Sequence, residues 1–442
     1  ASEKIVSQKI LNLASKKPDY PKFEIEKALS WCQKKIGYPL AEGQRKAVEL
    51  ALRERVLIIT GGPGVGKTTI LRSVLMILRA KKVAPILCAP TGRAAKRMSE
   101  TTGLEASTIH RLLEFKGHSG KFAHDENNPV EGDLFIVDEA SMIDIQLMSS
   151  FLRALPKNAH LILVGDVDQL PSVGPGSVLS DMIQSNELPV ARLNEIFRQS
   201  SESRIITAAH EINEGILPIE LSKSARNNPN SDFFFISSDE PDKTAETIAN
   251  IVSLRVPEKL GLDPVNDIQV ITPMHRGSLG TQALNRKLQD SLNPASESTF
   301  EIERFGARYR VGDKVIQTRN NYEKETLNGD IGKVIEISTD PGKVIIQFSG
   351  QRTVSYEPGE LDEISPGFAI TVHKSQGSEF PCVVIPVSTQ HFLLLQRNLL
   401  YTAITRGSQV VVLVGQKKAA AMAVKNIDTK ERYRGLLQRL AD

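Results

Sequence analysis

The chain has 442 residues, which is too long for one compact core and indicates two to four domains of roughly 100–200 residues each. Apolar residues make up 40% and charged residues 24% of the sequence, as in ordinary globular proteins, which excludes wholesale disorder and collagen-like repeats. The formal net charge is only +3, so overall charge does not identify a polyanion-binding protein, and any basic surface must be local.

Cysteine content and hydropathy bound the cellular setting. Three widely separated cysteines, Cys32, Cys88 and Cys382, cannot form a disulfide framework or a four-cysteine zinc site, which favours a reducing, cytoplasmic location. No apolar run approaches the ~20 residues that a membrane span needs, and no secretory signal is expected. The chain opens on Ala1 and Ser2 without methionine, which indicates a piece of a longer protein.

The pattern of apolar residues changes near residue 41. Residues 1–40 are polar with loose apolar stripes, typical of a small helical accessory segment. After that, continuous apolar runs alternate with helical patterns, as in parallel strands buried between layers of helices. We therefore predict two α/β domains in tandem, at 41–190 and at 191–304 with 366–420. The expected strands are Val56–Thr60, Ala84–Ala89, Leu134–Val137, His160–Gly165, Phe233–Ile236, Ile268–Ile271, Val383–Val387 and Val410–Val414.

Two segments interrupt this alternation. Residues 112–131 are polar and contain glycine, which favours a β-hairpin insertion or an exposed loop in the first domain. Residues 305–365 contain short strand patterns separated by Asn-Gly and Pro-Gly turns, which predicts a small antiparallel barrel inserted in the second domain. The last residues, 421–442, are expected to form a C-terminal helix.

A phosphate-binding pattern, G-x-x-x-x-G-K-[ST], lies between the first apolar strand and a helical run. Its glycines let backbone N–H groups turn toward a phosphate, at the positive end of the following helix. Lys67 would contact the β- and γ-phosphates, and the Thr68 hydroxyl would ligate Mg²⁺. The predicted nucleotide-binding residues are Gly61, Gly62, Pro63, Gly64, Val65, Gly66, Lys67, Thr68 and Thr69.

Two further apolar strands end in polar side chains. Leu134–Val137 leads into Asp138 and Glu139, which we expect to hold the Mg²⁺ shell and to act as general base on the attacking water, respectively. Gln169 follows the strand His160–Gly165, where an amide can hydrogen-bond the γ-phosphate. Taken alone, Gln169 is more typical of a surface turn than of a phosphate sensor.

Other short motifs occur in a fixed order along the chain. The first precedes the phosphate-binding segment, and the last ends in an arginine between the expected strands Val383–Val387 and Val410–Val414. They are Ala41–Gln44, Ala89–Ala95, Ser107–Leu112, Asp138–Ser141, Gly165–Pro171, Phe197–Gln199, Thr371–Glu379 and Tyr401–Arg406.

These motifs, from about Gln44 to Gly415, resemble those of superfamily 1 helicases and most closely the RecD-type branch. The resemblance implies an α/β fold of two tandem RecA-like P-loop domains, with a hairpin insertion and an SH3-like β-barrel insertion, and 5′→3′ movement on single-stranded DNA. It also implies that Gln44 reads adenine, that Arg198 and Arg406 approach the γ-phosphate, and that Glu379 lies in the motif coupling DNA to nucleotide. The implied DNA-binding residues are Thr91, Arg93, Thr108, His110, His373 and Lys374.

Several assignments stay open on the residues alone. His110 fits core packing and base stacking equally well. The aromatic residues near the insertions are plausible base stackers, although such residues are more often plain packing residues, and two lysines after the first long helix fit a solvated surface. These residues are Phe115, Phe122, Tyr322, Lys81 and Lys82.

The function predicted from the sequence is an ATP-dependent DNA helicase with ATP and Mg²⁺ as cofactors. Its expected partners are single-stranded DNA and 5′-tailed duplex, with a single-strand-binding or recombination and repair protein as a further candidate, and the expected state is a monomer. Two alternatives remain, a DNA-stimulated ATPase that remodels protein–DNA complexes and a nucleotide-dependent binding switch. RNA also remains open as substrate, because contacts to a single-strand backbone discriminate poorly.

Overall fold

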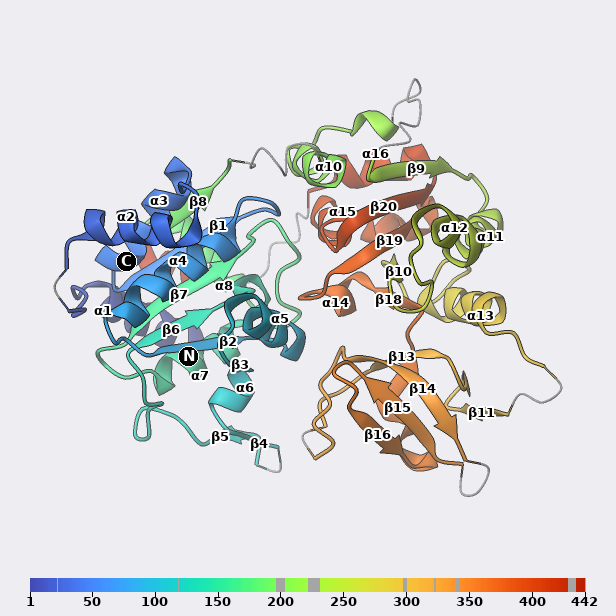
Figure 1. The fold of residues 1–442 in the computed structure, drawn as a ribbon, viewed down its shortest axis with the longest axis horizontal. Helices are drawn as coiled ribbons and strands as arrows, with labels where there is room; N and C mark the ends of the chain where they lie inside the picture. Colours follow the sequence, from blue (N-terminus) through green and yellow to red (C-terminus); the bar gives the residue numbers. More distant parts are fainter. Residues whose placement is uncertain are drawn as a thin grey trace. The chain divides into compact units, whose positions relative to one another are not determined.

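The computed structural model describes residues 1–21, 23–117, 119–195, 203–221, 231–296, 300–321, 323–338, 342–427 and 435–441. The chain divides into two compact units, each with its own parallel sheet, as Figure 1 shows. Unit 1 comprises residues 1–201 and 429–442, and unit 2 comprises residues 202–428. The predicted α/β class is confirmed. In the described ranges, no helix combines the length and hydropathy needed to cross a membrane.

The sheet of unit 1 has six parallel strands in the order β3-β2-β6-β7-β1-β8. Val190 of β8 lies opposite Ile58 of β1, so the first domain extends beyond its expected boundary at residue 190. Because β8 is short and only partly buried, the sequence pattern did not predict this strand. The strands are β1 Val56–Gly61, β2 Pro85–Ala89, β3 Ala106–Thr108, β6 Leu134–Val137, β7 His160–Gly165 and β8 Val190–Leu193.

Helices cover both faces of this sheet, and alternate side chains of each strand therefore enter two separate cores. Leu57 and Ile59 of β1 pack in one core, whereas Val56 and Ile58 pack in the other. The first core includes α2 Ile25–Ile36, α3 Glu42–Arg53 and α4 Lys67–Ala80. The second includes α1 Ser2–Ala14, α7 Ile145–Ala154, α8 Val178–Gln184 and α17 Leu436–Ala441.

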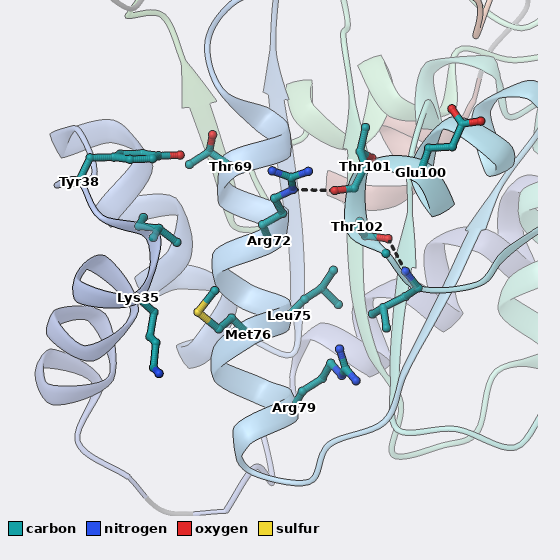
Figure 2. A pocket seen from close by; sticks show the side chains of 13 residues that line it. Lys35, Tyr38, Thr69, Arg72, Leu75, Met76, Arg79, Glu100, Thr101 and Thr102 are labelled. Carbon is teal, nitrogen blue, oxygen red and sulfur yellow. Dashed lines mark hydrogen bonds between the residues drawn. The ribbon is translucent and has the colours of Figure 1, made fainter.

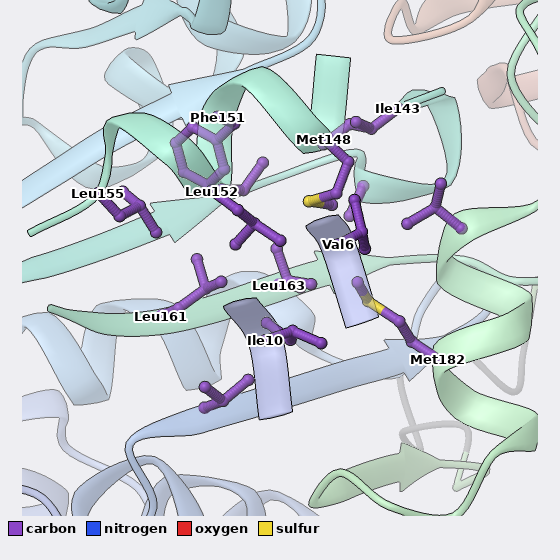
Figure 3. Packing of buried hydrophobic residues seen from close by; sticks show 14 of the residues in the cluster. Val6, Ile10, Ile143, Met148, Phe151, Leu152, Leu155, Leu161, Leu163 and Met182 are labelled. Atoms are coloured by element: carbon purple, nitrogen blue, oxygen red, sulfur yellow. The ribbon is translucent and has the colours of Figure 1, made fainter. Parts of the chain in front are cut away.

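The two ends of the chain complete the second core. Val6 and Ile10 of α1 are fully buried beside Met148 of α7, as Figure 3 shows. Segment 1–40 is helical as predicted, but α1 belongs to the main core rather than to an accessory piece. The expected helix at 421–442 is wrong, because α16 Lys417–Lys425 lies in unit 2 while α17 packs on α1 in unit 1.

Unit 2 is built on five parallel strands in the order β18-β10-β19-β20-β9. Its strands are β9 Phe233–Ser237, β10 Ile268–Thr272, β18 Ala369–Thr371, β19 Phe380–Val387 and β20 Gly407–Gly415. Buried valines and isoleucines of these strands form a core with side chains of α11 Pro241–Asn250, α12 Val256–Leu260 and α13 Thr281–Leu292. The other helices described in unit 2 are α10 Arg204–Asn213, α14 Val372–Ser375, α15 Arg397–Ile404 and α16.

The predicted antiparallel module is inserted in unit 2, between α13 and β18. Its five strands are ordered β16-β15-β14-β13-β17, with a separate hairpin of β11 and β12. The Lys314 ammonium group donates to the Ile268 carbonyl at 3.0 Å, and Gln289 donates to the Asp313 carboxylate, which attach the module to β10 and α13. The strands are β11 Glu301–Arg304, β12 Ala307–Arg310, β13 Lys314–Gln317, β14 Ile331–Ile337, β15 Val344–Phe348, β16 Thr353–Tyr356 and β17 Ile364–Pro366.

A buried histidine makes the stability of unit 2 sensitive to pH. His391 is 1% exposed, and within the described part of the chain neither ring nitrogen has a hydrogen-bond partner. Burial lowers its pKa from 6.5 to about 4. The unfolded chain therefore takes up a proton before the folded chain does, so stability present above pH 6.5 is lost as pH falls toward 4.

Replacing His391 by leucine should remove this pH dependence. The loss in wild type between pH 6.5 and 4 is on the order of 3 kcal/mol, because one pKa unit corresponds to about 1.4 kcal/mol. Denaturant unfolding of both proteins across this pH range measures the free energy of unfolding. The difference between the two proteins at each pH removes the contribution of carboxylates that titrate in both. Parallel curves for the two proteins would contradict the assignment.

Candidate functional site

The loop between β1 and α4 has the backbone of an anion site. Gly64 and Gly66 adopt positive φ angles of 73° and 78°, which side chains with a Cβ rarely adopt. Gly66 caps α4, a helix of 14 residues whose first N–H groups have no partner within the helix. These donors and the positive end of the helix dipole together favour a phosphate.

Lys67 begins α4 and reaches back over this loop. Its ammonium group donates to the carbonyl oxygens of Gly61 and Gly62, the second at 2.9 Å. The positive charge is thus held beside the loop by the chain's own backbone. This placement suits a cation that contacts phosphate oxygens.

Asp138 stands one position beyond β6 and continues its pairing, because its backbone N–H donates to the Cys88 carbonyl at 3.0 Å. Its carboxylate accepts from the Glu139 N–H at 2.8 Å. Burial and the Glu139 charge raise the pKa of Asp138 to about 6, while the Lys67 and Arg97 charges oppose this rise. A cation bound beside such a buried carboxylate would stabilise its ionised form.

The surroundings of Asp138 fit Mg²⁺, which prefers oxygen ligands and retains several waters. Nowhere in the described ranges do three carboxylate, histidine or cysteine side chains converge as metal ligands. A cation here would therefore rest on Asp138, the Thr68 hydroxyl, waters and phosphate oxygens. The assignment of Asp138 and Thr68 as metal ligands remains a prediction.

Glu139 and Gln169 are both held in constrained positions. Glu139 has φ 52°, in the left-handed region that residues other than glycine seldom occupy and that recurs at functional sites. The Gln169 amide donates to the Asp166 carboxylate at 3.1 Å, and Gln169 is 9% exposed. This burial distinguishes Gln169 from an ordinary surface-turn residue.

Strand register brings these groups together. Thr60 of β1 lies opposite Gly165 of β7, and Leu163 of β7 lies opposite Val137 of β6. The loops that follow the three strands therefore leave the same edge of the sheet, where ligands bind in open α/β sheets. Lys67, Gln169 and the pair Asp138–Glu139 all belong to these loops.

Gln44 lies near the start of α3 and is 4% exposed. Its side-chain oxygen accepts from the Ala41 N–H at 3.2 Å, which orients the amide at the helix N-terminus. The oxygen is therefore engaged within the chain. Contact with adenine remains a prediction for this residue.

The candidate DNA-binding threonines of unit 1 cap helices at adjacent strand ends. Thr91 accepts from the Ala94 N–H at the start of α5 Gly92–Thr102, and Thr108 accepts from the Arg111 N–H at the start of α6 Ile109–Leu112. Ala89 and Thr108 are paired across β2 and β3, so both caps lie at one edge. Arg93 follows Thr91 in α5.

His110 packs against the hairpin rather than standing free. Its ring lies 5.6 Å from both Phe115 and Phe122, whose own ring centroids are 5.1 Å apart. These phenylalanines pair across β4 Phe115–Lys116 and β5 Lys121–Phe122, inside the expected insertion at 112–131. Burial lowers the pKa of His110, and the Asp144 charge opposes this shift.

The candidates in unit 2 follow β18. Thr371 caps α14 by accepting from the Lys374 N–H at 3.3 Å; His373 is exposed and Lys374 is half-buried, and burial lowers the Lys374 pKa. Sequence reasoning missed His275, which follows the neighbouring strand β10. Burial and the Lys374 charge lower the His275 pKa, and the His275 Nδ1 lies 3.1 Å from the Thr281 hydroxyl. The sequence signal that could have indicated His275 is its position in the segment Pro273–Arg276, directly after a strand.

Arg406 is 3% exposed and is fixed within unit 2. Its guanidinium donates to the carbonyl oxygens of Thr402 and Ser378, both at 3.2 Å. It thereby ties the end of α15 to the loop containing Glu379, which is itself exposed. Arg198 and Tyr322 lie outside the described residues.

Comparison with known proteins identifies the family. Three family models match successive parts of the chain: an AAA domain at 44–175, the ATP-dependent RecD-like DNA helicase SH3 domain at 284–348, and the UvrD-like helicase C-terminal domain at 366–414. The RecBCD enzyme subunit RecD of Mycolicibacterium smegmatis is 31% identical over 430 residues, covering 90% of this chain and 75% of that protein. The chain belongs to the RecD-like helicase family.

Another member of this family is longer. The ATP-dependent RecD2 DNA helicase of Deinococcus radiodurans is 36% identical over 407 residues, which cover 92% of this chain. The chain spans only 53% of that relative's length. The RecD-like resemblance of the motifs is thus confirmed, and the SH3 match begins at residue 284, earlier than the expected 305.

Solved structures of lower identity share the fold. The Pif1 helicase from Candida albicans matches with a TM-score of 0.52 at 20% identity, covering 90% of this chain and 97% of that one. Bacteroides Pif1 bound to single-stranded DNA matches with a TM-score of 0.51 at 18% identity, covering 85% and 92%. The likeness to these two structures concerns the fold alone.

Gly61→Ala should weaken nucleotide binding. A Cβ at Gly61 would meet the Leu193 carbonyl oxygen at 2.7 Å and the Val65 side chain at 2.9 Å, so the loop must shift. We expect a loss of about tenfold or more in ATP affinity, since overpacking costs about 1–3 kcal/mol. Binding of a fluorescent ATP analogue measures it. In the control Gly359→Ala the new Cβ meets nothing within 4 Å, and affinity should not change. Equal affinities for both variants would contradict the role of Gly61.

Proposed function

We propose that this protein is an ATP-dependent DNA helicase that moves 5′→3′ on single-stranded DNA and couples Mg-ATP hydrolysis to duplex unwinding. One observation carries the proposal. Neighbouring strands β1, β7 and β6 bring Lys67, Gln169 and the Asp138–Glu139 pair to one edge of the sheet, in a member of the RecD-like family. The direction rests on the family resemblance.

The groups at this edge suit phosphoryl transfer to water. The N–H groups after Gly61 and the Lys67 ammonium would hold the β- and γ-phosphates. Thr68 and Asp138 would hold Mg²⁺, which when bound neutralises charge on those phosphates. Glu139 would accept the proton of the attacking water, a role worth about 10²–10⁴-fold in rate. Gln169 would sense the γ-phosphate.

Unit 2 supplies the remaining groups of the proposal. Arg406 and Arg198 are proposed to stabilise charge that develops on the γ-phosphate, as the family resemblance implies. Loss of that phosphate would then weaken the hold of the two units on one nucleotide, and alternate gripping of DNA would give net stepping. Thr91, Arg93, Thr108 and His110 of unit 1, and His373 and Lys374 of unit 2, are the proposed strand contacts.

The hairpin of β4 and β5 is proposed to separate the strands. A motor that pulls one strand needs a rigid element at the junction to keep the other strand from following. The paired rings of Phe115 and Phe122, braced by His110, give the hairpin a firm base. Because His110 lies in a predicted strand-binding motif, the hairpin is anchored beside the proposed DNA path.

Duplexes with a single-stranded tail test the proposal directly. With ATP and Mg²⁺, unwinding should occur on a duplex with a 5′ tail and not on one with a 3′ tail, and DNA should stimulate the ATPase. Affinity for the single strand should fall with salt at a log–log slope of about −0.7 per phosphate contacted. DNA-stimulated ATPase without unwinding on either tail would favour a remodelling ATPase. An ATPase indifferent to DNA would favour a switch.

Shortening the hairpin should uncouple unwinding from ATP hydrolysis. Replacing Lys116–Lys121 by Asn-Gly, a favoured hairpin turn, keeps the Phe115–Phe122 base. We expect DNA-stimulated ATPase within about twofold of wild type but much slower unwinding, because each base-pair step costs ~1.4 kcal/mol to open.

The matched control for the shortened hairpin replaces Lys116 and Lys121 by serine, which removes charge but keeps hairpin length. This control should unwind at nearly the wild-type rate. If ATPase and unwinding fall together in the shortened variant, the hairpin only supports the fold.

A further inference from the structure

Unit 1 carries a groove in which only Thr69, at one end of the lining, has a role in the proposed catalytic cycle. It has a volume of about 580 Å³ and lies between the end of α2, the outer face of α4 and the end of α5. Figure 2 shows Lys35 on one side, Arg72, Met76 and Arg79 along α4, and Thr101 on the other side. All of these elements belong to unit 1.

Positive charge gathers around this groove. Lys35, Arg72 and Arg79 line it, and the only lining carboxylate is Glu100. In the part of the chain that the structure describes, none of these three cations forms an ion pair. The Arg72 side chain is fixed, because its Nε donates to the Thr101 carbonyl at 2.6 Å. The groove therefore presents uncompensated positive charge in a chain that is nearly neutral overall.

The lining also contains apolar surface. Met76 of α4 lies between Arg72 and Arg79 along the helix, Leu104 is also half-buried in the lining, and Tyr38 is 52% exposed at one end. Methionine adapts its shape to different partners, and tyrosine offers a flat apolar face with a polar tip. A ligand that uses the whole groove must thus combine negative charge with apolar side chains.

Single-stranded DNA is a poorer match for the groove. Thr91, the proposed strand contact, caps the start of α5, whereas Thr101 lies near its end, roughly 15 Å away along the helix. Non-specific strand binding uses aromatic residues in series, and Tyr38 is the only aromatic residue in this lining. The groove begins at Thr69, beside the phosphate loop, and extends along α4 to Arg79, roughly 15 Å further along the helix.

We propose that this groove binds an acidic peptide segment of a partner protein that carries leucine or aromatic side chains. The carboxylates pair with Lys35, Arg72 and Arg79, and the apolar side chains pack on Met76 and Leu104. Charge complementarity indicates an acidic partner. The apolar residues of the lining favour a peptide with apolar side chains over a polyanion that has none.

Fluorescence anisotropy with labelled synthetic peptides tests this proposal on the full chain. The probe alternates aspartate with leucine; one reference peptide replaces leucine by serine and another replaces aspartate by lysine. The first should bind, and both references should bind much more weakly. The double variant Lys35→Glu with Arg79→Glu should lose about tenfold or more in affinity for the probe.

The matched control reverses two cations outside the lining, Lys81→Glu with Lys82→Glu, and should stay within about twofold of wild type. DNA-stimulated ATPase verifies that both double variants are folded. If both double variants lose affinity for the probe equally, the effect is one of net charge and the proposal is overturned. If the serine peptide binds as tightly as the probe, the apolar side chains do not contribute and the proposal is also overturned. Competition of the probe with single-stranded DNA would assign the groove to the strand path, and competition with ATP would assign it to the nucleotide; either overturns the proposal.

Discussion

Parallel pairing of β1 with β7, and of β7 with β6, is the constraint on which the candidate site depends. It brings Lys67, Asp138 and Gln169 to one edge of the sheet, although they are distant in the sequence. The buried strands resist any slip in register, because a shift by one residue would exchange the side chains of the two cores. The chemistry is thus positioned by a hydrophobic core on each face.

Helix α4 links this edge to the rest of unit 1. Its first residue, Lys67, serves the phosphate loop, while Leu71 and Leu75 bury their side chains in one of the two cores. Its outer face lines the cationic groove. One helix therefore contributes to the phosphate loop, to the core and to a surface suited to a partner. A substitution in α4 that suits one of these three can disturb the other two.

The sequence predicted the central strands because side chains buried on both faces leave continuous apolar runs. It also predicted which loops carry charged groups, since the glycine and carboxylate patterns are local. It predicted a helix at the C-terminal end but not that α17 packs on α1, because that position depends on contacts such as the Gly435 N–H donating to Glu3. The packing of His110 likewise depends on the register of Phe115 with Phe122, which no local pattern reveals.

The central claim is that nucleotide state and DNA affinity are linked through the edge that holds Lys67 and Glu139. Glu139→Gln should bind Mg-ATP without rapid turnover, so its affinity for a labelled single strand can be measured at equilibrium in Mg-ATP and in Mg-ADP. Coupling free energies of about 1–3 kcal/mol predict affinities that differ by roughly 5–150-fold. Identical affinities in the two nucleotides, with both nucleotides demonstrably bound, would contradict the account.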